Sequence, residues 1–279
     1  YNVHGAGSEL TQFMKADLKN LTKTLKASRK ALLADYDPED LHALRVAIRR
    51  IRTHLDALAD KHSDKQRERW AKIVSRTNSA RDWDVFWSDL ENVLTDEEFD
   101  SIEPVLRERR DKARARVLAL LDSRDWSNTM AWWRRYLDET KGHKRREQPG
   151  LSIGRIEHRL GKASRKARIR GEDRDWHKLR IAAKELRYTL DERLQSGGGQ
   201  LEHRIAWCAQ LQDSLGNWHD CVVERGLLEE LRHELSRVSR QPGLSVIAML
   251  LNRVDARQQA CLDEARALLA SGKELRING

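Results

Sequence analysis

Proline, cysteine and long apolar segments are all scarce in this 279-residue sequence. With only four prolines, little in the chain interrupts helix formation. No apolar run approaches the roughly 20 residues that span a bilayer, and no secretory signal is visible at the amino end. The three cysteines, Cys208, Cys221 and Cys261, form no C-x2-C pair. The sequence therefore predicts buried, reduced thiols in a cytoplasmic protein that has no membrane partner.

The motifs of common catalytic and metal sites are also missing. The sequence has no G-x4-G-K-[ST] phosphate loop and no G-x-S-x-G elbow. It has no H-E-x-x-H, no Cys/His cluster at zinc spacing, and no acidic cluster that would hold Mg²⁺ beside phosphates. A catalytic dyad at His219-Asp220 is one alternative, but a capping or structural role is simpler. We expect no catalytic residue, metal or cofactor, and hence a binding protein rather than an enzyme.

Charged residues are numerous, and their balance is basic. Lysine and arginine total 53 against 44 aspartates and glutamates, which gives a net charge of +9. Charged residues make up 35% of the chain and hydrophobic residues 39%, as in a folded, highly charged helical protein. The basic surplus indicates attraction to polyanions but does not identify one.

Helical periodicity runs through nearly every segment between breaking residues, and no alternating run is long enough to predict a sheet. Asp37 as N-cap and Pro38 as first residue indicate one helix start. Gln241-Pro242-Gly243 is expected to form a turn. The expected helices cover about 8–33, 38–61, 96–122, 126–140, 152–169, 174–194, 200–238 and 244–270, with one or two more in 64–94.

A four-residue spacing of basic side chains occurs twice, 135 residues apart. On a helix, each set occupies a stripe about 80° wide and about 15 Å long. Cations stacked in this way repel one another unless an anion lies against them, so two such helices predict a basic cleft for a long polyanion. We call the sets the first and second basic stripes; they consist of His42, Arg45, Arg49 and Arg52, and of His177, Arg180, Lys184 and Arg187.

An apolar stripe recurs beside each basic stripe, about 120° away on the helical wheel. Long basic side chains at this shoulder can lie along apolar surface and present their charged ends to a groove. A single arginine-rich face is more simply explained as a solvated surface, but the recurrence of both patterns favours a duplicated site. The apolar residues are Leu44, Ile48, Ile51 and Leu55, and Leu179, Ala183, Leu186 and Leu190.

The repetition extends beyond the stripes. The sequence K-A-S-R-K-A occurs at 26–31 and again at 162–167, and residues 81–85 align with 217–221 at an offset of 136. The chain is therefore interpreted as two tandem halves, about 8–140 and 152–270, joined by a linker at about 141–151. The repeated lysines either add charge to the site or lie on a solvated face; they are Lys26, Lys30, Lys162 and Lys166.

Nine tryptophans allow an alternative ligand. Exposed indole rings can stack on the bases of single-stranded nucleic acid. However, Trp176 falls where Leu41 lies in the first copy, so a packing role is the simpler expectation.

At residues 41–52 and 176–188 the sequence resembles the CHAD domain (conserved histidine α-helical domain), and further marks of that family occur at 80–85 and 211–220. The resemblance covers essentially all of 1–279. It implies an all-α fold, in which two tandem pseudo-symmetric bundles surround a basic central channel that binds inorganic polyphosphate. It assigns the binding to the residues of both basic stripes, with Arg50 and Arg81 as further candidates. It also implies that Asp84 and Asp220 orient basic side chains.

The predicted function is thus a non-catalytic polyphosphate-binding module that targets or scaffolds, in the cytoplasm and in association with polyphosphate granules. Two alternatives remain open: a nucleic-acid-binding protein that uses the same cations, and a phosphoryl-processing enzyme.

Overall fold

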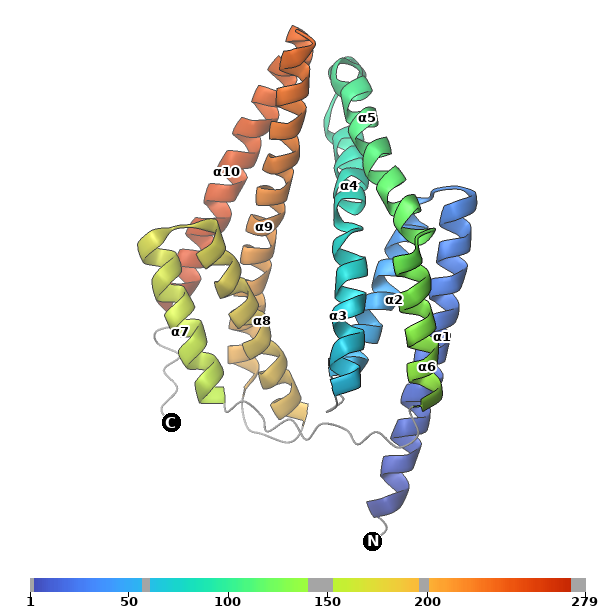
Figure 1. Cartoon of the computed structure of the whole chain (residues 1–279). Coiled ribbons are helices and arrows are strands. Elements are labelled where there is room, and N and C mark those ends of the chain that lie inside the picture. The colour runs from blue at the N-terminus through green and yellow to red at the C-terminus, as the bar shows by residue number, and fades with distance from the viewer. Residues whose placement is uncertain (1–2, 57–60, 140–152, 196–200, 272–279) are drawn as a thin grey trace. The chain divides into compact units, whose positions relative to one another are not determined.

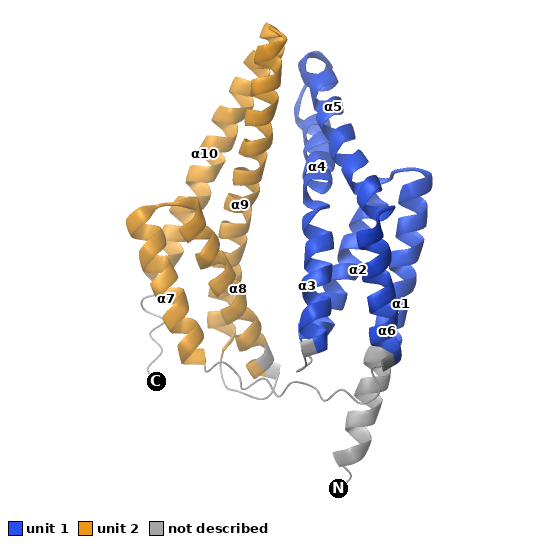
Figure 2. Cartoon of the chain, viewed as in Figure 1, with its two compact units in different colours: residues 1–147 blue, residues 148–279 orange. Residues whose placement is uncertain are grey.

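The computed structural model describes residues 3–56, 61–139, 153–195 and 201–271, and these form ten α-helices (Figure 1). The chain divides into two compact units, residues 1–147 and 148–279 (Figure 2). Unit 1 holds α1 (Val3–Ala34), α2 (Pro38–Asp56), α3 (Lys61–Ser75), α4 (Asn78–Val93), α5 (Asp96–Leu121) and α6 (Arg124–Glu139). Unit 2 holds α7 (Ile153–Arg170), α8 (Asp173–Gln195), α9 (Glu202–Arg237) and α10 (Gln241–Ser271).

Helix α2 is central to the packing of unit 1, because it contacts α1, α3 and α4. Its start is fixed as the sequence predicts: Pro38 is its first residue, and the Asp37 side chain accepts a hydrogen bond from the Glu39 amide at 2.8 Å. Helix α5 packs on α4 and begins with a capping box between Thr95 and Glu98. The first basic stripe therefore lies on a helix that three neighbours hold in place.

In unit 2, α7 packs on α8, α8 on α9, and α9 on α10. Helices α9 and α10 form a long pair in Figure 1, of 36 and 31 residues. The core of the unit is built around two fully buried indoles, Trp176 of α8 and Trp218 of α9. Helix α10 contributes Ala265 and Leu269 to this core.

The all-α fold and most helix limits agree with the sequence predictions, but two expectations are wrong. The helix predicted over 38–61 is described as α2 over Pro38–Asp56, and Lys61, the predicted last residue, belongs to the separate helix α3. The turn predicted at 241–243 is the first turn of α10, where proline is tolerated because its missing N–H has no helical partner. The chain reverses just before it, at Ser239, which has a φ of 51°. The predicted linker at about 141–151 lies outside the described residues, and so does the glycine-rich segment 196–199, for which the sequence predicts a flexible connection.

The three cysteines are free thiols, with Cys208 and Cys221 buried and Cys261 half-buried. Burial raises the pKa of Cys208 from 9.0 to about 12, so this thiol stays protonated and packs as an apolar group. Within the described ranges, no helix carries a stretch apolar and long enough to cross a membrane.

Candidate functional site

The first basic stripe lies on the shoulder of α2 that the wheel predicts. Leu44, Ile48, Ile51 and Leu55 are all fully buried. The basic residues lie beside them, with His42 and Arg49 exposed and Arg45 and Arg52 half-buried. Burial of the apolar face thus leaves the cations at the edge of the core, two of them partly enclosed.

Arg45 is fixed by the junction between α3 and α4. Its Nη1 donates to Thr77 Oγ1 at 2.6 Å, to Asn78 Oδ1 at 2.9 Å and to the Val74 carbonyl at 3.3 Å. Burial lowers the pKa of Arg45, and the positive charges of Arg81 and Arg49 lower it further, while Asp82 opposes them. Arg45, Arg49 and Arg81 are therefore close enough to form one positive region.

Arg52 has a different environment. Its Nε is buried and has no hydrogen-bond partner among the described residues. A buried donor without an acceptor is costly, and each such group in a native structure needs an explanation. A bound anion would provide the missing acceptor.

A carboxylate next to this region gathers two further arginines. The Asp84 side chain is 0% exposed, and its Oδ1 accepts from Arg110 Nε at 3.1 Å and from Arg114 Nη2 at 2.7 Å. Tyr36 donates its hydroxyl proton to Asp84 Oδ2 at 2.8 Å. Burial, together with the Asp84 charge, raises the pKa of Tyr36 far above its usual value. Asp84 therefore orients basic side chains, as the resemblance implied, but these arginines come from α5 rather than from the stripe.

The Asp84 cluster carries more positive than negative charge and is held firmly. Arg110 lies 4.4 Å from the centre of the Trp87 ring, and Arg114 lies 4.6 Å from that of Tyr36. Their side chains are only 18% and 19% exposed. Neither arginine is predicted from the sequence, because α5 carries no repeated motif and only the tertiary fold brings them to Asp84.

Arg50 lies off the first stripe. Its Nη2 contacts both carboxylate oxygens of Asp17 on α1 at 3.2 Å, and His54 Nε2 contacts the same carboxylate at 2.7 Å. One residue on a helix turns the direction by about 100°, so Arg50 follows Arg49 in sequence but lies on the α1 side of α2.

The second stripe lies on α8 and is more enclosed. His177, Arg180 and Arg187 are half-buried, and Lys184 is exposed. Arg187 donates to Gln212 Oε1 at 3.4 Å, and its Nε lies 3.7 Å from Asp191. The Leu179, Ala183, Leu186 and Leu190 side chains beneath it are buried. As in α2, the cations lie at the edge of a packed core.

The first two residues of the second stripe have buried nitrogen atoms that no described residue satisfies. His177 Nδ1 and Arg180 Nε are both buried and have no hydrogen-bond partner in the described part of the chain. The ring of His219 on α9 lies 5.4 Å from that of His177, centre to centre. His219 and Asp220 lie in the middle of α9, so neither caps a helix. Asp220 is exposed, and no hydrogen bond or ion pair joins it to a basic side chain of the described residues.

The remaining candidates are the four repeated lysines. Lys26, Lys30 and Lys162 are exposed and Lys166 is half-buried. No hydrogen bond or ion pair between described residues joins any of the four to a stripe, so their role stays a prediction. The first stripe belongs to unit 1 and the second to unit 2, and the central channel also stays a prediction.

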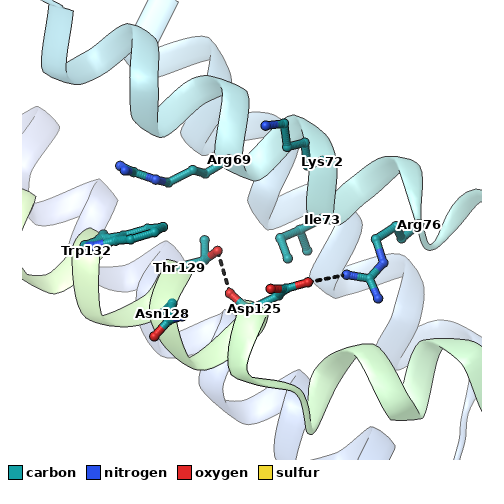
Figure 3. A pocket seen from close by; sticks show the side chains of 8 residues that line it. All are labelled: Arg69, Lys72, Ile73, Arg76, Asp125, Asn128, Thr129 and Trp132. Carbon is teal, nitrogen blue, oxygen red and sulfur yellow. Dashed lines mark hydrogen bonds and ion pairs between the residues drawn. The ribbon is translucent and has the colours of Figure 1, made fainter.

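A pocket of about 330 Å³ lies elsewhere in unit 1, between α3 and α6 (Figure 3). The Arg69 guanidinium covers the Trp132 ring at 3.7 Å from its centre, and Arg76 pairs with Asp125 at 2.8 Å. Two of its cations thus already have partners. Its lining consists of Arg69, Lys72, Ile73, Arg76, Asp125, Asn128, Thr129 and Trp132.

The tryptophans do not form a stacking surface. Of the nine, only Trp132 is exposed, at 39%, and Arg69 already covers its ring. Trp176 is fully buried like Leu41, which confirms the packing role predicted for it. The structure therefore gives no support to base stacking.

Comparisons with known proteins agree with this architecture. The family described as CHAD domain matches residues 16–229. The crystal structure of the CHAD domain from the plant Ricinus communis matches with a TM-score of 0.60 and 22% identity, over 94% of this chain and 91% of that one. PptA from Streptomyces chartreusis matches with a TM-score of 0.65 and 15% identity, over 95% and 99%. No curated protein matches the chain.

Proposed function

Because the chain belongs to the CHAD domain family, we propose that it binds inorganic polyphosphate through its two basic stripes. The observation that carries the proposal is the set of three stripe nitrogens that are buried without a hydrogen-bond partner among the described residues: Arg52 Nε, His177 Nδ1 and Arg180 Nε. Phosphate oxygens would satisfy them.

The residue types suit a chain of phosphates. Arginine offers a planar fork for two oxygens, whereas lysine offers a compact charge on a movable stem. Each stripe combines enclosed donors with an exposed cation, Arg49 or Lys184. A polyanion can therefore contact several cations of one helix at once.

We propose further that one long polyphosphate chain contacts both stripes, and that binding serves to target or scaffold rather than to process the chain. Long polyphosphate should then bind more tightly than short polyphosphate, since a second stripe reached by the same molecule adds its contacts at high effective concentration. Association with polyphosphate granules belongs to the same proposal.

Charge reversal at Arg49 and Lys184 tests the proposal. Both side chains are exposed, so the double variant Arg49→Glu with Lys184→Glu should keep its helicity by circular dichroism. Calorimetric titration with long-chain polyphosphate should show binding by the parent chain and none by the variant. The matched control is Arg135→Glu with Arg253→Glu, which removes the same charge from exposed positions of α6 and α10 and should bind like the parent.

Equal binding by the Arg49/Lys184 variant and the parent would show that the stripes are not the site. Competition in the same titration addresses the nucleic-acid alternative, because polyphosphate should displace RNA or DNA at a far lower concentration than the reverse. Sustained release of orthophosphate in the presence of Mg²⁺ or Mn²⁺, if it disappears in the His42→Ala variant, would instead show that the protein is an enzyme.

A further inference from the structure

Over residues 80–86, three buried positions of α4 match buried positions of α9 that lie 135 residues later, which is also the spacing of the two stripes. Farther along the two helices burial differs, as at Leu90, which is buried, and Arg225, which is exposed. In this register Ala80 matches Leu215, Trp83 matches Trp218, and Phe86 matches Cys221; all six are buried. The register differs by one residue from the offset of 136 suggested by the sequence.

The structural register places His219 of α9 at the position of Asp84 in α4. In unit 1 this position supplies a buried carboxylate that neutralises part of the charge of Arg110 and Arg114. In unit 2 it supplies an imidazole instead. Near it lie His177 and Arg180, and no carboxylate of the described residues forms an ion pair with either, whereas the arginines of unit 1 pair with Asp84.

Two basic side chains near His219 have nitrogen atoms without a hydrogen-bond partner among the described residues. Across from it on α8 lie His177, whose Nδ1 has no partner, and Arg180, whose Nε has none within the described residues. On α9 itself Trp218 packs beside the ring. The carboxylate that affects its titration is the exposed Asp220 of α9, and α10 contributes no charged group to it.

We propose that His219 is a phosphate-binding residue of the second stripe, and that it makes polyphosphate binding by this unit tighten as the pH falls. This rests on the proposed function above. His219, His177 and Arg180 together would enclose one phosphate group, with the bound anion taking the place that a carboxylate fills in unit 1.

The direction of the pH effect follows from the free protein. Burial lowers the pKa of His219 below the usual imidazole value, and the charges of Arg180 and His177 lower it further, while Asp220 opposes them. The ring is therefore neutral near pH 7 in the free protein. A phosphate beside it favours the charged form, so binding takes up a proton and the affinity rises as the pH falls below about 7.

The first measurement is a calorimetric titration of the full chain with long-chain polyphosphate between about pH 5.5 and 7.5, in buffers of different ionisation enthalpy. The parent should take up protons on binding. His219→Asn should lose part of this uptake and reduce the gain in affinity over the pH range by about three- to tenfold, the effect of up to one unit of pKa. His203→Asn, an exposed position of the same helix, should behave like the parent.

The second measurement does not depend on folding of the variant. In the parent chain, the imidazole carbon–proton signal of His219 should titrate at a higher pH with polyphosphate than without it. An unchanged titration, or equal proton uptake by His219→Asn and the parent, would overturn the role of His219 while polyphosphate binding itself stands. Failure of the parent to bind polyphosphate at any pH would overturn the proposed function as well.

Discussion

Arg45 and Arg52 lie on the same stripe of α2, yet their side chains differ in their hydrogen bonds. Arg45 donates to three acceptors at the α3–α4 junction, whereas Arg52 Nε is buried without a partner in the described structure. Arg45 thus contributes to the fold as well as to the positive field. A stripe of like residues in sequence therefore contains both a structural anchor and free donors for a ligand.

This difference predicts how replacing Arg45 with lysine changes the stability of the protein. Arg45→Lys keeps the charge but cannot reproduce the guanidinium bonds to Thr77 and Asn78, and should lower the free energy of unfolding by about 1–3 kcal/mol. Urea denaturation would measure the change. Arg49→Lys, at an exposed position without such bonds, is the control and should change the free energy by less than about 0.5 kcal/mol. Equal values for both variants would contradict an anchoring role for Arg45.

At the scale of helices, the placement of Arg110 and Arg114 depends on how α5 begins and packs. Thr95 and Glu98 form a reciprocal capping box at its first turn, with Glu98 accepting from the Thr95 amide at 2.9 Å. The arginines follow farther along the same helix and reach back to Asp84 on α4. The start of α5 therefore stabilises the helix that supplies the cluster.

Removing the cap should weaken unit 1 without touching a basic residue. Thr95→Ala should lower the free energy of unfolding by about 1 kcal/mol, because the Glu98 amide loses its side-chain acceptor. Thr95→Ser retains a hydroxyl and should recover most of the loss. Thermal or urea unfolding followed by helicity would show both effects; a Thr95→Ala variant as stable as the parent would mean that the capping box contributes nothing measurable.

The helices and stripes were predictable because their signals are local. Apolar residues at helical spacing identify the buried face of α2 and α8, and the basic residues beside them follow from the same wheel. Arg110 and Arg114 were not predictable, because what distinguishes them is their contact with Asp84 on another helix, and only the packing of α5 on α4 creates that contact. The match of His219 with Asp84 was also hidden, because the offset of 136 pairs Asp84 with Asp220 instead, and only burial favours the offset of 135 in this segment. Pro242 misled the turn prediction because proline fits equally well in the first turn of a helix.

At the scale of the whole molecule, charge determines how binding should respond to salt. The chain carries a net charge of +9, and the two stripes bring eight basic side chains to two helices. Binding of a flexible polyanion to such a set releases condensed counterions. The electrostatic part of the affinity should thus be large.

The affinity for long-chain polyphosphate should fall by roughly a hundredfold or more between about 50 and 200 mM salt. Plotted as the logarithms of affinity and salt concentration, single reversals such as Arg49→Glu should reduce the slope by about one, whereas Arg135→Glu should leave it unchanged. Titrations at four or more salt concentrations would give the slope. A shallow slope for the parent would indicate that few phosphates contact the cations.

The family match ends at residue 229, but the packing of unit 2 does not. Ser214 of α9 donates to the Cys261 carbonyl at 2.8 Å, and Trp207 Nε1 donates to that of Leu268 at 2.9 Å. Ala265 and Leu269 of α10 complete the core around Trp218. A module excised at the limit of sequence similarity would therefore expose the apolar side of α9 directly behind the second stripe. The smallest transferable version of this half has to retain α10 through Ser271.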